Sequence, residues 1–313
     1  MPPSHPKLVF RLAVAAVFAA LLLVIAGGLV TSRDAGLAVP DWPLSYGTLN
    51  PPRWWAIENV RTEHGHRLVA ACVALLTVAM AAAARMRPCP ARVRTLATWA
   101  ACLVLVQAVL GGLRVLAMSL DLAMIHGVVA QVYFVVLVLT AAASSPLAAG
   151  RPSRGRLPAA AARVLELLTV VVAGQLVLGI VIRHLGPAVR PLADNWVFYL
   201  HVTVGLAIFT FAVHLRRLAP SAPASRLRRA IGMLPLLVGG QILLGILTWL
   251  VTDDMRGDLA ASVWQAWLPT LHVALGALVF AAIAALAALP AITRESAEEG
   301  IDGSAVPATG VLR

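Results

Sequence analysis

The chain has 313 residues, of which 60% are hydrophobic and only 12% are charged. A soluble globular chain is about 45–50% apolar and about 25% charged, so this chain carries more apolar surface than a water-soluble core can bury. Soluble enzymes, secreted disulfide scaffolds and nucleic-acid-binding domains are therefore excluded. The formal net charge of +11 is interpreted as membrane topology rather than affinity for nucleic acid.

Eight apolar runs are each about 20 residues long, which is enough for a helix to cross a bilayer. In chain order they are 8–30, 66–84, 96–117, 122–143, 163–182, 197–215, 231–251 and 266–289. The first run follows Lys7 and Arg11, as in a secretory signal. Because it is too long and no small-residue cleavage site follows, we predict a membrane helix there.

Basic residues alternate between the loops. Seventeen of the 25 Lys and Arg residues fall in the two chain ends and in every second loop. The positive-inside rule places this set in the cytoplasm. We therefore predict a multi-pass protein of the cell (plasma) membrane, surrounded by lipid, with both termini cytoplasmic. Cys72, Cys89 and Cys102 are predicted to be free thiols, because they do not form a disulfide framework.

Two short patterns repeat along the spans. Three odd-numbered spans contain Gln and Gly four residues apart, while the first span has Gly27 and Gly28 without the Gln. Each even-numbered span has a His followed by a small residue one turn later. The Gln–Gly pairs are Gln107–Gly111, Gln175–Gly179 and Gln241–Gly245, and the histidines are His66, His126, His201 and His272.

The repeat predicts an all-α polytopic membrane protein whose eight transmembrane helices form two pseudo-symmetric four-helix bundles. We place the N-terminal half at residues 1–145, a cytoplasmic linker at 146–163, the C-terminal half at 164–290 and a polar, disordered tail at 291–313.

Four histidines at equivalent positions on one side of a membrane indicate a shared ligand. Imidazole is the commonest axial ligand of heme iron, and the simplest pairing joins His66 with His126 and His201 with His272. A small residue one turn away would let a flat macrocycle approach the backbone. Two alternatives remain open. One is a purely structural repeat of small residues, and the other is a four-histidine zinc cluster.

Arg67, Arg114 and Arg183 lie near the same outer ends. Arginine pairs with carboxylates in bidentate fashion, so these side chains are candidate partners of heme propionates. The alternative is that they extend outward to the lipid interface.

Glu63 lies three residues before His66, and no equivalent carboxylate precedes the other three histidines. A carboxylate beside only the first histidine pair suggests that this pair is a site of chemistry. The alternative is an acidic residue that stabilises the start of a helix.

These residues resemble a known family. The segments Gly-Gly-Leu-Val-Thr-Ser at 27–32, Ala-Gly-Leu-Ala-Val-Pro-Asp-Trp-Pro-Leu at 35–44 and Glu-His-Gly-His-Arg at 63–67 are similar to those of heme A synthases. The resemblance implies an eight-helix enzyme that oxidises a methyl group of heme O to the formyl group of heme A for terminal oxidases. It implies that Glu63 acts beside the substrate heme at His66 and His126, and that His201 and His272 hold a heme b. It also suggests heme O synthase and terminal oxidase assembly proteins as partners.

The chain departs from many bacterial members, which have a cysteine pair in the first outer loop where this chain has Val39 and Ser45. Two other function classes remain as alternatives. A di-heme b-type electron carrier would bind two hemes without modifying either. A transporter would need charged or broken helices at mid-membrane, and the spans contain no convincing example.

Overall fold

The computed structural model describes residues 6–146, 148, 157–184, 194–219, 225–253 and 263–302. Eight helices in these ranges are long and apolar enough to span a membrane, and no β-strand forms within them. The helices are α1 (Lys7–Ser32), α2 (Glu58–Met86), α3 (Ala91–Leu116), α4 (Leu120–Ser144), α5 (Ala159–His184), α6 (Trp196–Leu218), α7 (Ser225–Asp253) and α8 (Val263–Asp302), with one short 3₁₀ helix, η1 (Trp54–Ala56). The predicted all-α, multi-pass membrane fold is confirmed.

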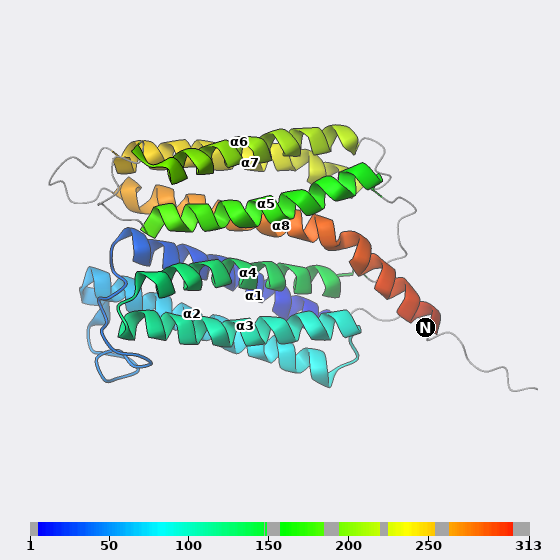
Figure 1. Ribbon diagram of the computed structural model, residues 1–313. Helices are drawn as coiled ribbons and strands as arrows, with labels where there is room; N and C mark the ends of the chain where they lie inside the picture. Colours follow the sequence, from blue (N-terminus) through cyan, green and yellow to red (C-terminus); the bar gives the residue numbers. More distant parts are fainter. Residues whose placement is uncertain are drawn as a thin grey trace, which may run out of the picture.

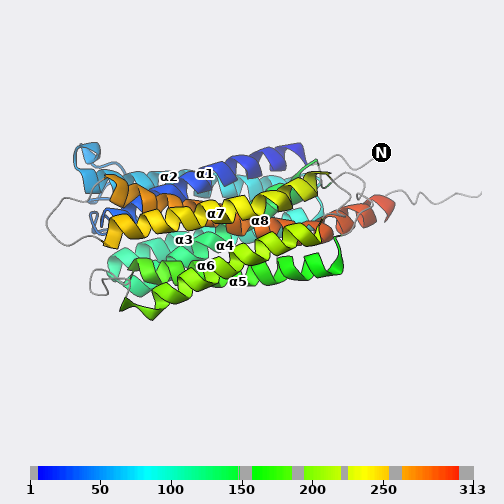
Figure 2. The same ribbon diagram turned by 90° about the horizontal axis from the view of Figure 1, so that it is seen from above.

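The helices run side by side in one elongated bundle (Figures 1 and 2). Contacts join α1, α2, α3 and α4 in a closed ring, and α5, α6, α7 and α8 form a second ring. The two rings meet where α1 and α4 pack against α8, and where α4 packs against α5. Helices α1, α4, α5 and α8 therefore form the interface between the two rings.

Small residues allow these helices to approach closely. Val9, Ala13, Ala16 and Ala20 are buried at successive turns of α1, and small side chains at such spacing are typical of helix contacts in lipid. Large apolar side chains elsewhere remain exposed, as on a surface that faces lipid. Examples are Phe18 at 66%, Leu75 at 73% and Leu236 at 73% exposure.

Two helix ends differ from the predicted spans. Helix α2 begins at Glu58, two turns before the predicted apolar run, and so includes Glu63 and His64. Helix α8 continues to Asp302, so residues 291–302, which we expected to be disordered, are helical. The local sequence contains three Glu and two Ala residues, which favour helix. The expectation for residues 303–313, like that for residues 147 and 149–156 of the 146–163 linker, lies outside the described residues, and residues 159–163 of that linker belong to α5.

The beginning of α1 and the end of α8 lie at one end of the bundle, and the 33–57 loop lies at the other (Figure 1). A topology reporter fused after residue 294, or placed within 151–158, is expected to report the cytoplasm, because these segments carry the basic clusters. A reporter within 34–60 is expected to report the outside. An opposite signal at any of the three positions would contradict the predicted orientation.

Candidate functional site

Each of the four repeat histidines lies against the repeat glycine of the preceding helix. The position that a glycine Cβ would occupy is 3.0–3.3 Å from the Cε1 atom of the facing imidazole in all four cases. A methyl group at that distance would have to displace the ring. The pairs are Gly27 with His66, Gly111 with His126, Gly179 with His201 and Gly245 with His272. The two sequence patterns are therefore parts of one contact.

The repeat glutamines bind the backbone of the same histidine residues. The side-chain amide of Gln175 donates to the His201 carbonyl at 2.8 Å, and that of Gln241 donates to the His272 carbonyl at 2.9 Å. Gln107 donates to the His126 carbonyl at 3.1 Å. A carbonyl oxygen has two lone pairs, so each bond ties two neighbouring helices without breaking either helix.

Two of the small residues that follow the histidines, Gly205 and Gly276, lie against a repeat glutamine. A Cβ on Gly205 would be 3.3 Å from the Gln175 amide nitrogen, and one on Gly276 would be 3.0 Å from that of Gln241. These glycines therefore make room for a glutamine side chain. Sequence reasoning assigned that room to a macrocycle because the pattern does not reveal which neighbour fills it.

The histidine rings retain unused hydrogen-bonding capacity. The Nδ1 atoms of His66, His126, His201 and His272 are all buried and have no hydrogen-bond partner. In each ring Nδ1 is on the edge near the glycine. The four rings thus have equivalent surroundings, and in each of them Nε2 is the ring nitrogen that lies farther from the glycine.

The second pair has a spacing that fits one metal between two rings. The ring centroids of His201 and His272 are 6.3 Å apart, with an interplanar angle of 63°. A metal–imidazole bond is about 2 Å long, and a ring centroid lies about 1 Å behind the nitrogen, so two rings on opposite sides of one metal have centroids about 6 Å apart. In the first pair, His66 lies within electrostatic reach of His126.

Among the described residues, no group of three or more His, Cys, Asp or Glu residues is arranged to hold a metal ion. All four repeat histidines are described, so they do not converge on one ion. The zinc cluster that we considered as an alternative is therefore not supported by the geometry, which places the histidines in two pairs.

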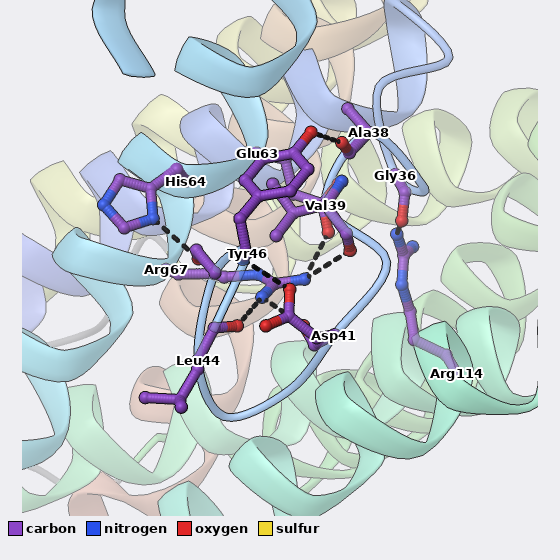
Figure 3. A network of polar contacts seen from close by, with 11 residues as sticks. Gly36, Ala38, Val39, Asp41, Leu44, Tyr46, Glu63, His64, Arg67 and Arg114 are labelled. Atoms are coloured by element: carbon purple, nitrogen blue, oxygen red, sulfur yellow. Dashed lines mark hydrogen bonds and ion pairs between the residues drawn. The ribbon is translucent and has the colours of Figure 1, made fainter. Parts of the chain in front are cut away.

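The carboxylate of Glu63 holds the 33–57 loop against α2 (Figure 3). One oxygen accepts from the Val39 backbone N–H at 2.8 Å, and the other accepts from Arg67 at 2.7 Å. Glu63 is only 3% exposed. It is the sixth residue of its helix and receives side-chain and loop donors, so its environment differs from that of a residue that simply stabilises the helix start.

Arg67 binds the loop backbone rather than extending outward. Its guanidinium donates to the carbonyls of Asp41, Leu44 and Val39 at 2.7, 2.9 and 3.0 Å, in addition to Glu63. These four bonds use most of its five N–H donors. Arg67 is thus engaged by the loop, and it is a weaker candidate for a propionate than the sequence suggested.

Asp41 closes the next turn of this loop. Its carboxylate accepts from the backbone N–H groups of Gly47 and Tyr46 at 2.8 and 2.7 Å. The bond from Gly47 is the main cause that lowers the pKa of Asp41 below its ordinary value of 3.8. Because the pKa of Asp41 is lower in the folded state, its carboxylate contributes fully to the stability of the turn at pH values above 3.8. This contribution is lost as the pH falls through the folded-state pKa.

A buried hydrogen bond lies where the resemblance led us to compare cysteines. Ser45 and His64 are each 2% exposed, and the Ser45 hydroxyl is 2.8 Å from Nδ1 of His64. Val39 is fully buried. The loop is thus joined to α2 by polar contacts at Val39 and Ser45. Sequence reasoning missed His64 and Asp41 because their partners are distant in the chain. All three cysteines are free, as predicted.

The other two arginines also point into the protein. Arg114 donates to the Gly36 carbonyl at 2.6 Å, and Arg183 donates to the Gly28 carbonyl at 2.7 Å and the Ser32 hydroxyl at 2.8 Å. Neither has a carboxylate within ion-pair distance in the described part of the chain. Arg114 lies within electrostatic reach of both His66 and His126. Both arginines retain unused N–H donors beside a histidine pair.

The glycine contacts give a stability prediction. Gly245→Ala places a methyl group 3.0 Å from the His272 ring, and such overpacking costs about 1–3 kcal/mol. At Gly232, the same substitution meets nothing within 4 Å and is expected to stabilise the helix by about 0.5–1 kcal/mol. Thermal unfolding in detergent measures both. Equal gains from the two variants would show that the His272 ring does not need the glycine.

Comparisons with known proteins point in one direction. Residues 3–138 match the family described as COX15-CtaA, cytochrome oxidase assembly protein. The chain is 34% identical over 174 residues to a heme A synthase of Symbiobacterium thermophilum, covering 53% of this chain and 56% of the relative. It is 39% identical over 92 residues to a protoheme IX farnesyltransferase of Haloarcula marismortui, covering 29% of this chain and 19% of that protein. The chain thus spans about half the length of the first relative and about a fifth of the second. The chain is thus similar to this family over its first four helices and to a heme A synthase over about half of its length.

Proposed function

We propose that this protein is a heme A synthase that oxidises the methyl group of heme O to the formyl group of heme A for terminal oxidases. The observation that carries the proposal is the asymmetry between two similar sites. Two histidine pairs have glycine walls and unpartnered Nδ1 atoms, but among the residues whose burial is described only the first has a buried carboxylate, Glu63, on the same helix. The proposed reaction requires two heme sites, one where the substrate heme is oxidised and one where a second heme transfers electrons.

In this proposal, His66 and His126 hold the substrate heme, and His201 and His272 hold a heme b. The propionates of the two hemes pair with Arg114 and Arg183, which retain unused N–H donors and have no carboxylate partner in the described ranges. Arg67 instead supports the loop that covers the first site.

The chemistry assigns a distinct task to Glu63. Conversion of a methyl to a formyl group consumes one water and releases four protons and four electrons. When bound, the heme b supplies one-electron redox chemistry. Each oxygen of Glu63 accepts one hydrogen bond from protein, and a carboxylate oxygen can accept more than one. Glu63 can therefore receive a proton from the substrate edge or stabilise positive charge there.

The proposed reaction has a place in the cell. We propose the cell membrane as its location, with both histidine pairs toward the outer face and both termini in the cytoplasm, because the basic loops lie on the opposite side. Heme O would arrive from a heme O synthase, and the product would pass to terminal oxidase assembly.

Co-expression of the chain with a heme O supply, followed by chromatography of extracted hemes, tests this function. We expect heme A to appear only when the chain is present. If the purified protein binds two hemes but converts none from a proven heme O supply, a di-heme electron carrier is the better interpretation.

A further inference from the structure

Arg183 of α5 connects the two helix rings. A single guanidinium nitrogen, Nη2, donates to both the Gly28 carbonyl and the Ser32 hydroxyl of α1. The arginine belongs to the ring that holds His201 and His272, whereas both acceptors belong to the other ring. Its charge lies within electrostatic reach of His272. A cation in this partly buried position, without a carboxylate in the described residues, acts strongly on its surroundings because the local dielectric is low.

A chain of hydroxyl groups fixes this contact. The Thr270 hydroxyl donates to the Ala266 carbonyl at 2.7 Å and lies 3.3 Å from the Ser32 hydroxyl. Because the Thr270 proton is used in this way, Ser32 donates to Thr270 while its oxygen accepts from Arg183. The donors therefore run in one direction, from Arg183 through Ser32 to Thr270. Thr270 is fully buried and lies two residues before His272.

The same segment of α1 forms the wall between the two histidine pairs. Gly27 faces the His66 ring, and Gly28 faces Thr270, where a Cβ would be 2.8 Å from the threonine methyl group. Two adjacent glycines thus face side chains of the two helix rings, one on each side. The Gly28 carbonyl that binds Arg183 belongs to this wall.

We propose that the charge of Arg183, held in place by the N-terminal helices, sets the reduction potential of the heme held by His201 and His272. This proposal rests on the proposed function, because it requires a heme at that pair. A nearby positive charge favours the reduced heme, which carries one positive charge less. Ser32 and Thr270 keep the guanidinium in place, so a hydroxyl in the first ring influences the cofactor in the second.

Spectroelectrochemical titration of the purified full-length protein tests the proposal. Arg183→Gln is expected to lower the midpoint potential of this heme, while Arg183→Lys, which keeps the charge, is expected to retain most of the wild-type value. Ser32→Ala and Thr270→Val should each shift the potential in the same direction as Arg183→Gln, but by less. If Arg183→Gln does not fold, the midpoint potentials of Ser32→Ala and Thr270→Val test the proposal on their own.

Arg217→Gln and Thr210→Val are matched controls on α6. The Thr210 hydroxyl bonds only to its own helix at the Leu206 carbonyl, as far as the described contacts extend, and both controls are expected to keep the wild-type potential. Full heme content with an unchanged potential in Arg183→Gln, or in both hydroxyl variants, would overturn the inference. A wild-type protein that binds no heme would instead contradict the proposed function.

Discussion

Glu63→Gln is expected to abolish most heme A formation while leaving the heme at His201 and His272 in place. Gln keeps the size of the side chain but removes its negative charge and its capacity to accept a proton. Loss of a positioned general base typically reduces a rate by about 10²–10⁴-fold. Extracted hemes should therefore contain heme O, with a partly oxidised alcohol form, and little heme A.

The structure adds a second consequence of this substitution that must be separated from the first. Glu63 accepts hydrogen bonds from both the Val39 N–H and Arg67. In Gln, one of the two carboxylate oxygens is replaced by an NH₂ group, which cannot accept the hydrogen bond from Val39 or Arg67. Breaking a buried ion pair costs about 3–5 kcal/mol, so the 33–57 loop is also expected to be held less firmly against α2.

Asp41→Asn separates loop anchoring from chemistry. Asp41 holds the Tyr46–Gly47 turn of the same loop but does not contact Glu63 in any described hydrogen bond. We expect this variant to retain much more heme A formation than Glu63→Gln. Equal losses in the two variants would mean that Glu63 acts by holding the loop, and a wild-type yield from Glu63→Gln would remove it from the reaction.

His201→Ala and His272→Ala should each eliminate the low-spin, bis-histidine b-type spectrum of the purified protein. The ring centroids of the two histidines are 6.3 Å apart, so removal of either side chain leaves one axial ligand. Loss of a residue that merely orients a metal-bound histidine costs about 10–100-fold in metal affinity, and loss of the ligand itself should cost at least as much. Absorbance spectroscopy and heme content per protein measure this effect.

His214→Ala provides the control, because His214 is on the same helix as His201 but near its opposite end. This variant should keep the full spectrum and heme content. Size-exclusion chromatography then shows whether the two ligand variants remain folded. If both ligand variants retain a complete low-spin signal, the proposed pairing of His201 with His272 is wrong.

Local sequence determined which parts of this protein are helices. A run of about 20 apolar residues must form a helix in lipid, because no water is present to satisfy its backbone. All eight spans could therefore be predicted without knowledge of the partners of any helix. The repeat also identified His66, His126, His201 and His272, because the spacing of polar residues within an apolar helix is a local property.

The sequence alone could also suggest the Glu63–Arg67 pair, because residues four apart share a helix face. It could not show that Val39, Ser45 and Asp41 would join Glu63, His64 and Arg67 in one network. These contacts form only when a loop of more than 20 residues folds back onto α2. The sequence does not determine such a closure, since many turns of similar energy are available to a loop of that length.

Tertiary structure alone decided what faces each small residue. Gly27, Gly28 and Gly276 all belong to the repeat patterns, yet the structure places them against three different side chains: His66, Thr270 and Gln241, respectively. A glycine has no side chain, so it specifies only that something approaches closely. The identity of that neighbour depends on which helices pack together and at what depth, and this is fixed by the combined packing of the whole bundle.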